Sequence, residues 1–289
     1  MHTNYSRIIA GTMTWGSWGK QLLASQMAGL MHHCKNAGIT TFDHADIYGG
    51  YTTEADFGNA FAQSGIDRES IEIISKCGIQ YEAENRQNTI KHYDYSADYI
   101  IWSAETSLKN LQTDYLDLLL LHRPSPLMHP DEIAKAIDQL KTQGKIKEFG
   151  VSNFTPSQMT MVDTKNTITA NQIQFSLTDF DAMHNGTLDH MITHSIIPMA
   201  WQPLGSVFRE KNEQINRIHT VLDNLTEKYN ATKDQLVLAW ILKHPAGIHP
   251  VIGTTTPERI TNAVKATEIE LSLEDWFTLL VESQGHKVP

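Results

Sequence analysis

The sequence predicts a (β/α)₈ barrel, an α/β fold of the TIM-barrel type. Short apolar runs alternate with longer amphipathic stretches along the whole chain of 289 residues, as expected when each strand is followed by a helix. No change in composition and no Pro-, Ser- or Gly-rich linker divides the chain. Barrels of this type run to about 250 residues as single domains, so the length suits one barrel. We therefore expect residues 1–289 to form a single barrel domain.

Eight short runs rich in β-branched and apolar residues are the expected strands. In chain order they are Arg7–Met13, Thr40–Asp43, Ile71–Lys76, Leu116–His122, Ile146–Val151, Thr169–Ile173, Ile196–Trp201 and Pro250–Ile252. Helical spacing of apolar residues marks the stretches Gln26–Ala37, Ala55–Ala62, Ala97–Leu111, Asp131–Gln143 and Asn212–Tyr229. Gly38, Gly65 and Gly144 stand where helix C-termini are expected, because glycine adopts the left-handed conformation there at little cost.

The alternative fold is a doubly wound open sheet that binds a dinucleotide. That fold carries G-x-G-x-x-G after its first strand, because the glycines let the backbone approach the pyrophosphate. The first expected strand is followed here by Gly16-Ser17-Trp18-Gly19, which has a different spacing. The sequence therefore favours the closed barrel.

Composition argues against several classes of function. The formal net charge is −10, and an acidic surface repels phosphate backbones, so nucleic-acid partners are not expected. No apolar run approaches the roughly 20 residues that a membrane-spanning helix requires, and no signal-peptide pattern opens the sequence. Cys34 and Cys77 are too few for a disulfide framework. We expect a cytoplasmic protein that acts on a small molecule; its oligomeric state is not predicted.

Polar residues end three consecutive expected strands. Asp43 ends the second strand and is followed by Tyr48, Lys76 ends the third, and His122 ends the fourth. The C-terminal ends of barrel strands meet at one mouth, where barrel enzymes carry their active sites. Closure of the barrel would therefore bring together a carboxylate, a phenol, an ammonium and an imidazole.

This set of groups suits the reduction of a carbonyl. Hydride transfer to the carbonyl carbon builds negative charge on the oxygen, which must be stabilised and protonated. Tyr48 can serve as the acid, since the ordinary pKa of a tyrosine is about 10, and a nearby Lys76 ammonium would lower that pKa. Asp43 would hold Lys76 charged, and His122 would orient the carbonyl oxygen.

Each of these residues also has a structural interpretation when it is taken alone. Asp43 could cap the turn after its strand, with Asp46 as the functional carboxylate instead. Tyr48 could be a packed aromatic residue, Lys76 a surface lysine with a buried stem, and His122 a hydrogen-bonded core histidine. Their joint occurrence at consecutive strand ends favours the functional interpretation.

Several motifs resemble those of the aldo/keto reductase family, in that family's order, over most of the chain. They are Thr41–Tyr51, Ile73–Lys76, Leu116–Pro124, Phe149–Phe154, Asn171-Gln172 and Thr256–Ile260. The run His-Ala-Asp-Ile-Tyr-Gly-Gly-Tyr, with Ser-Lys-Cys-Gly-Ile downstream, is especially similar to a branch of uncharacterised bacterial oxidoreductases. The resemblance implies a catalytic tetrad of Asp43, Tyr48, Lys76 and His122, with Tyr48 as the general acid.

The resemblance also implies NADP(H), bound in an extended form across the barrel mouth. Ser152 and Asn153, joined by Gln172, would bind the nicotinamide carboxamide, and Trp201 occupies the place where the family stacks an aromatic ring on the nicotinamide. Asp43 would also touch the nicotinamide ribose. The remaining implied contacts are Gly11, Thr12 and Met13 beside the ribose, and Gln202, Pro203, Leu204 and Gly205 along the pyrophosphate.

The far end of the cofactor is predicted from local sequence as well. Thr256 and Pro257 suit the N-cap and the first position of a helix. Arg259 would fall in the first turn, where the helix dipole disfavours a cation unless an anion lies beside it. The 2′-phosphate of NADP is such an anion, which favours NADP over NAD. The loop before this helix supplies Gly253, Thr254 and Thr255.

Three positions depart from the family's pattern. Gly253 stands where many members have a lysine that grips the 2′-phosphate, and Ala263 aligns with the usual asparagine at the adenine. Arg123 stands where many relatives place a large aromatic residue beside the substrate. It could select anionic carbonyls, or it could pair with an acidic loop residue, so the physiological substrate is not predicted.

Two other functions agree with parts of the sequence. The tetrad is also kept in cofactor-sensing subunits that resemble the regulatory β-subunits of potassium channels and turn over very slowly. His44-Ala45-Asp46 is similar to a motif of metal-dependent barrel hydrolases, but the H-x-H pair on the first strand is missing, so no metal is expected. The leading hypothesis is the NADPH-dependent reduction of an aldehyde or ketone to an alcohol.

Overall fold

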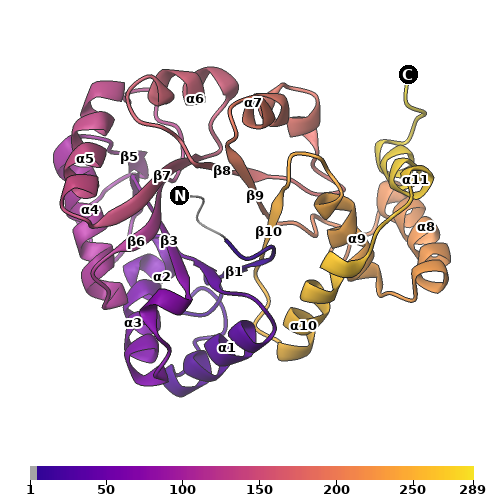
Figure 1. Ribbon diagram of the computed structural model, residues 1–289, viewed down its shortest axis with the longest axis horizontal. Helices are drawn as coiled ribbons and strands as arrows, with labels where there is room; N and C mark the ends of the chain where they lie inside the picture. Colours follow the sequence, from indigo (N-terminus) through magenta and orange to yellow (C-terminus); the bar gives the residue numbers. More distant parts are fainter. Residues whose placement is uncertain (1–4) are drawn as a thin grey trace.

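The computed structural model describes residues 5–289 and contains a closed barrel of eight parallel strands (Figure 1). Around the barrel the strands follow the order β1-β10-β9-β8-β7-β6-β3-β2. Their bounds are β1 Ile9–Gly11, β2 Thr41–Asp43, β3 Glu72–Cys77, β6 Leu116–Leu121, β7 Ile146–Ser152, β8 Ala170–Gln174, β9 Ile197–Trp201 and β10 His249–Ile252. The predicted (β/α)₈ barrel is confirmed, and so is each of the eight expected strands.

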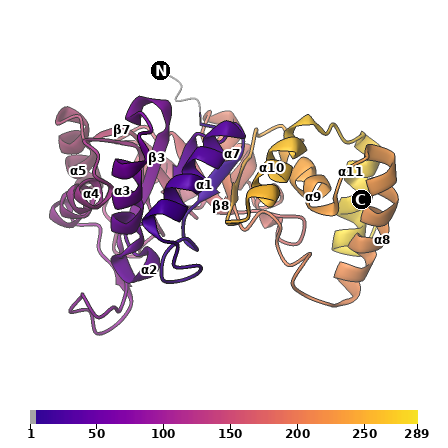
Figure 2. The same ribbon diagram turned by 90° about the horizontal axis from the view of Figure 1, so that it is seen from below.

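Helices follow the barrel strands and cover the outside of the barrel (Figures 1 and 2). Their bounds are α1 Ala24–Asn36, α3 Thr53–Ser64, α4 Ala97–Leu111, α5 Pro130–Thr142, α6 Pro156–Asp163, α7 Thr187–Thr193, α8 Glu213–Tyr229, α9 Lys233–Leu242 and α10 Pro257–Lys265. The C-terminal helix, α11 Leu273–Gln284, packs against α8 at the periphery of the molecule. Within residues 5–289, every helix is too short or too polar to cross a membrane.

Side chains of one strand alternate between two apolar layers. All six residues of β6 are buried. Leu118 and Leu120 belong to the cluster inside the barrel, whereas Leu119 and Leu121 join the larger cluster beneath the helices. This division follows from the period of two along a strand. Because the interior is filled by apolar side chains, polar groups gather at the mouth.

Two short elements at the mouth were not expected from the sequence. An antiparallel pair, β4 Ile79–Gln80 and β5 His92–Tyr93, leaves the barrel between β3 and α4. The short helix α2, Tyr48–Tyr51, contains two glycines with left-handed backbone, Gly49 at φ 63° and Gly50 at φ 65°. The Tyr51 hydroxyl donates to the carbonyl of Ile79, 3.3 Å away, and so joins the two elements. Figure 2 shows α2 at the lower edge of the barrel.

The seam between the first and last strands is fixed by an arginine. β1 and β10 are parallel, with Ile9 opposite Val251. The Arg7 guanidinium donates to three backbone carbonyls of the chain that leads into β10, those of Leu242, Gly247 and Ile248. These bonds join segments about 240 residues apart along the chain and therefore close the ring.

Candidate active site

The C-terminal ends of the eight barrel strands carry the residues that the sequence singled out. Asp43 ends β2, and Lys76 lies one residue before the end of β3. His122 follows β6 directly, and Tyr48 is the first residue of α2. The other strands contribute Gly11 at the end of β1, Ser152 at the end of β7, Gln172 within β8, Trp201 at the end of β9 and Gly253 just after β10.

Lys76 joins three of the four tetrad positions. Its ammonium lies 2.8 Å from Asp43 Oδ2 and 3.1 Å from the Tyr48 hydroxyl oxygen. It also donates to the backbone carbonyl of His44 at 2.7 Å. The Lys76 side chain is completely buried and Asp43 is nearly so. A buried ammonium with three hydrogen-bond acceptors is satisfied, which is the condition under which a protein interior tolerates a charge.

Burial decides the net pKa of Tyr48. Desolvation raises the pKa of its hydroxyl, the Lys76 ammonium opposes this rise, and the pKa ends above its ordinary value. Lys76 acts on the pKa of Tyr48 in the direction that the sequence predicted, but burial outweighs this single cation. Burial likewise disfavours the charged form of Lys76, but Asp43 and Tyr48 together raise the pKa of Lys76. The pair is therefore a neutral phenol beside a permanent ammonium.

His122 lies beside Tyr48 as a neutral imidazole. Burial holds the pKa of His122 well below its ordinary value, and the charges of Lys76, Arg123 and Lys91 act in the same direction. The ring centroids of His122 and Tyr48 are 6.1 Å apart, with the planes at 80°. His122 Nδ1 is buried without a hydrogen-bond partner in the described part of the chain. A neutral imidazole keeps one N–H donor, which can bind an oxygen held next to the phenol.

Hydrogen bonds connect the tetrad with the residues expected at the nicotinamide. The Gln172 side-chain amide donates to Asp43 Oδ1 at 2.9 Å, and the Ser152 hydroxyl donates to the backbone carbonyl of Gln172 at 3.0 Å. Asn153 then donates to the Ser152 hydroxyl at 2.8 Å, and the Trp201 indole N–H donates to Asn153 Oδ1 at 2.9 Å. Asp43 therefore belongs to both groups of residues, and one continuous network runs from Lys76 to β9.

The loop after β1 meets Asp43 from the other side. Thr12 is fully buried, and its hydroxyl donates to the Asp43 carbonyl at 3.0 Å. Gly11 lies in register with Asp43, and a Cβ on Gly11 would stand 3.2 Å from the carbonyl oxygen of Ile252. The Met13 side chain is 47% exposed. Gly11 and Thr12 therefore lie beside the tetrad, whereas Met13 forms part of the open rim.

The chain after β9 makes a tight turn at the mouth. Gln202 has a left-handed backbone with φ 56°, and Gly205 has φ 54°. A Cβ on Gly205 would lie 2.1 Å from the Thr178 hydroxyl oxygen, so only glycine fits there. Leu204 packs against the apolar core.

The loop before α10 is open to solvent. A Cβ on Gly253 would meet no other atom of the described chain within 4 Å, and the Gly253 carbonyl accepts the Thr14 hydroxyl at 2.9 Å. The Thr254 hydroxyl accepts the Thr256 N–H at 3.2 Å, which leaves Thr254 with a local structural role. Pro257 begins α10 as expected. Thr255 is half-buried on the same loop.

Arg259 is exposed in the first turn of α10, and within residues 5–289 its guanidinium has no ion-pair partner. A cation at this end of a helix opposes the helix dipole. An anion beside Arg259 stays a prediction.

Arg123 does not pair with an acidic loop residue in the part of the chain that the structure describes. Its guanidinium lies over the Trp201 ring, 5.3 Å from the centroid. The Tyr95 hydroxyl donates to the Arg123 carbonyl at 2.5 Å and accepts the Arg123 N–H at 3.1 Å. A positive charge is thus held at the mouth without a counter-charge.

Sequence reasoning missed the aromatic residues around the tetrad. The Trp18 ring lies 6.3 Å from the Tyr48 ring and 5.4 Å from the Tyr81 ring, measured between centroids. Trp18 belongs to the loop after β1, and Tyr81 follows β4. An aromatic residue in a loop that leaves a barrel strand was the available signal. The Trp18 side chain is 40% exposed, so it can contact a molecule that enters the mouth.

Comparison with known proteins agrees with this geometry. The model of the Aldo/keto reductase family matches residues 7–279. The chain is 41% identical to the uncharacterized oxidoreductase YcsN of Bacillus subtilis and 39% identical to the oxidoreductase YdhF of Escherichia coli, covering 99% of this chain and 96% of the relative in both cases.

A solved structure has the same architecture. The crystal structure of an aldo/keto reductase from Klebsiella pneumoniae in complex with NADP and acetate superposes with a TM-score of 0.79 at 26% identity, covering 95% of this chain and 90% of that chain. The motifs that suggested the resemblance therefore lie in a chain whose whole length matches. The protein belongs to the aldo/keto reductase family, whose members are oxidoreductases that act on small-molecule carbonyl compounds.

Proposed function

We propose that this protein reduces an aldehyde or ketone to an alcohol with NADPH, and that Tyr48 donates the proton. The observation that carries the proposal is the buried Lys76 ammonium, which contacts Asp43 and the Tyr48 hydroxyl at the same time. NADPH, when bound, supplies the hydride that reaches the carbonyl carbon. The carbonyl oxygen, on which negative charge develops, then takes the proton of the Tyr48 phenol, which lies next to the fixed Lys76 ammonium.

Tyr48 acts as the acid, and Lys76 stabilises the Tyr48 phenolate that proton transfer leaves. A phenol with a raised pKa keeps its proton at neutral pH, so it is in the form that can donate. Once the proton has left, the phenolate lies 3.1 Å from an ammonium that Asp43 holds in place. His122, as a neutral donor, orients the substrate oxygen toward Tyr48.

The residues at the mouth fit a nicotinamide. Ser152, Asn153 and Gln172 offer hydroxyl and amide groups for its carboxamide, and they are ordered by the network that reaches Asp43. Trp201 is half-buried beside them and offers an aromatic face. Asp43, Gly11, Thr12 and Met13 would border the ribose, and Gln202, Leu204 and Gly205 would border the pyrophosphate. The relative from Klebsiella pneumoniae binds NADP, which supports the same class of cofactor here.

The first experiment replaces Tyr48 by phenylalanine. Since general acid catalysis contributes roughly 10²–10⁴-fold to a rate, we expect kcat for reduction of a working aldehyde to fall by at least about 10²-fold. NADPH should still quench protein fluorescence with an unchanged Kd, because Tyr48 is not among the proposed cofactor contacts. Tyr229→Phe, which removes a hydroxyl remote from the mouth, serves as the control. Undiminished turnover by Tyr48→Phe would contradict the assignment.

The second experiment tests the preference for NADP. Arg259→Ala removes the exposed cation in the first turn of α10. If Arg259 binds the 2′-phosphate, KM for NADPH should rise about tenfold, the effect of losing one charge-assisted contact of about 1.4 kcal/mol. KM for NADH should not change, because NADH lacks that phosphate. Equal effects on both cofactors would remove Arg259 from the 2′-phosphate site.

A further inference from the structure

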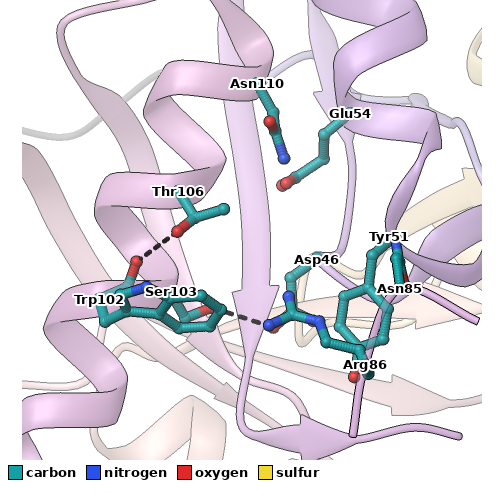
Figure 3. A pocket seen from close by; sticks show the side chains of 9 residues that line it. All are labelled: Asp46, Tyr51, Glu54, Asn85, Arg86, Trp102, Ser103, Thr106 and Asn110. Carbon is teal, nitrogen blue, oxygen red and sulfur yellow. Dashed lines mark hydrogen bonds between the residues drawn. The ribbon is translucent and has the colours of Figure 1, made fainter. Parts of the chain in front are cut away.

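A cavity lies on the outer side of the barrel wall, and no tetrad residue lines it. It has a volume of about 250 Å³ and opens between α3, α4 and the loop that joins β4 to β5 (Figure 3). The cavity is therefore distinct from the tetrad site. Its lining consists of Asp46, Tyr51, Glu54, Asn85, Arg86, Trp102, Ser103, Thr106 and Asn110.

Two buried carboxyl groups face this cavity. Asp46 is 6% exposed and Glu54 is 2% exposed. Asp46 Oδ2 accepts the Ser103 hydroxyl at 2.9 Å, but Asp46 Oδ1 is buried and has no partner within residues 5–289. Glu54 accepts the Ser75 hydroxyl at 2.5 Å. A buried acceptor without a partner costs free energy, so the Asp46 oxygen is a place for a donor that the chain itself does not supply.

The aromatic walls of the cavity already hold a cation. The Arg86 guanidinium carbon lies 4.0 Å from the Tyr51 ring centroid and 4.6 Å from the Trp102 ring centroid. Figure 3 shows Arg86 between these two rings, at the opening in front of Asp46. No carboxylate in residues 5–289 comes within ion-pair distance of Arg86. The guanidinium thus rests on the rings without reaching the acids behind them.

We propose that this cavity is a binding site for a small organic cation with a primary ammonium or guanidinium group. Its N–H groups would donate to Asp46 Oδ1, and its positive charge would lie between the rings of Tyr51 and Trp102, where Arg86 now lies. Arg86 is then an internal competitor on a loop. A metal ion fits less well, because the described residues contain no group of three or more His, Cys, Asp or Glu side chains placed to hold one.

The ionisation of Asp46 supports this geometry. Burial raises its pKa to about 8, and Glu54 adds to the rise, whereas the Ser103 hydrogen bond, a backbone hydrogen bond from Ile47 and the charge of Arg86 oppose it. A carboxyl group that burial keeps protonated lacks a sufficient counter-charge, and an entering cation would supply it. Cation binding below pH 8 should therefore release a proton. The titratable groups that face Asp46 are Glu54, Arg86, Tyr51, Tyr95, Tyr99 and Cys77.

The test is calorimetric titration of the whole chain with methylguanidinium and methylammonium, and with N-methylurea as a neutral probe of the same shape. We expect saturable binding of at least one cation and none of N-methylurea. Arg86→Ala should bind the cation about tenfold more tightly, since removal of a competing cation–π contact is worth up to about 1.4 kcal/mol. A gain in affinity cannot be explained by misfolding.

Loss-of-binding variants complete the design. Asp46→Asn and the milder Trp102→Leu, at a 44% exposed side chain, should each weaken binding, whereas Glu227→Gln on the exposed face of α8 should not. For the native chain at about pH 7, the heat should depend on the ionisation enthalpy of the buffer, which reports proton release, and this dependence should vanish near about pH 9. Absence of saturable cation binding in Arg86→Ala, equal binding of N-methylurea, or equal loss in Glu227→Gln would overturn the proposal.

Discussion

At the scale of single residues, burial and the Lys76 ammonium together set the protonation states of the site. The positive charge of Lys76 is balanced by Asp43, which lies 2.8 Å away. Lys76 nevertheless disfavours the protonation of His122 and favours the ionisation of Tyr48. Burial then keeps both of these neighbours neutral. The site therefore contains two neutral donors arranged around one ion pair.

This arrangement predicts how the rate depends on pH. Because the pKa of His122 lies well below 6.5 and that of Tyr48 lies above 10, kcat/KM for carbonyl reduction should stay constant between about pH 6 and 9. It should fall only above about pH 10, as Tyr48 loses the proton that we propose it donates. Steady-state rates measured at constant ionic strength would test this.

An acid limb with a midpoint near pH 6.5, the ordinary pKa of a histidine, would contradict the neutral assignment of His122. Asp46→Asn is the control, because Asp46 is the nearby carboxyl whose pKa of about 8 falls inside the tested range. Any inflection that disappears in this variant belongs to Asp46 and not to the tetrad.

At the scale of elements, the distance between two helices depends on one missing side chain. Gly58 of α3 lies against α4, where a Cβ would stand 2.0 Å from the Asn110 carbonyl oxygen. Gly29 lies in α1 with no atom within 4 Å of the same position. The two glycines share a helical backbone but differ in what surrounds them.

Replacing each glycine by alanine should therefore have opposite effects on stability. Gly29→Ala should raise the free energy of unfolding by roughly 0.5–1 kcal/mol, the helix propensity difference. Gly58→Ala should lower it by about 1–3 kcal/mol, because α3 must move away from α4. Denaturant unfolding monitored by circular dichroism measures both. A rise in the free energy of unfolding for Gly58→Ala would show that α3 and α4 can move apart without loss of stability.

The elements also show which parts of the structure the sequence could predict. β6 is a mostly apolar run that His122 follows directly, so both the strand and the polar residue at its end follow from local pattern. In contrast, α9 is buried in one unbroken run from Gln235 to Ile241, so no amphipathic period marks it. β4 and β5 have two residues each, too few for an alternation.

The same limit applies to the candidate site. The tetrad could be predicted because each member stands at or just after a strand end. The hydrogen bond from Gln172 to Asp43 joins residues 129 positions apart, and the register of a closed barrel, which local pattern does not supply, brings them together. The net pKa of Tyr48 could not be predicted for a related reason, since the depth of burial is a property of the assembled mouth.

At the scale of the whole molecule, stability depends on joining the two ends of the barrel. Arg7 supplies three hydrogen bonds to the segment that leads into β10. Burial lowers the pKa of Arg7 without removing its charge at neutral pH. A charged donor shared among three backbone carbonyls is one of the stronger contacts available to a fold.

Arg7→Met should therefore lower the free energy of unfolding by roughly 1.5–3 kcal/mol, the range for hydrogen bonds to a charged group. We expect one cooperative transition with an unchanged m value, because the seam is part of the whole barrel. Arg7→Lys, which keeps the charge but offers fewer directed donors, should give an intermediate loss. If Arg7→Met unfolds at the native midpoint, the seam does not depend on this side chain.

The β4–β5 pair has a consequence for how such a barrel can diversify. Its two strands pair with each other and with no barrel strand in the described chain. The residues between them are therefore not part of the strand pairing that closes the barrel. Insertions or deletions there leave register and closure unchanged, while the segment still stands over Tyr48 through Tyr81 and Trp18. Evolution can thus change this segment, and with it the range of molecules that the protein accepts, without changing the barrel. A protein engineer can exchange the segment in the same way.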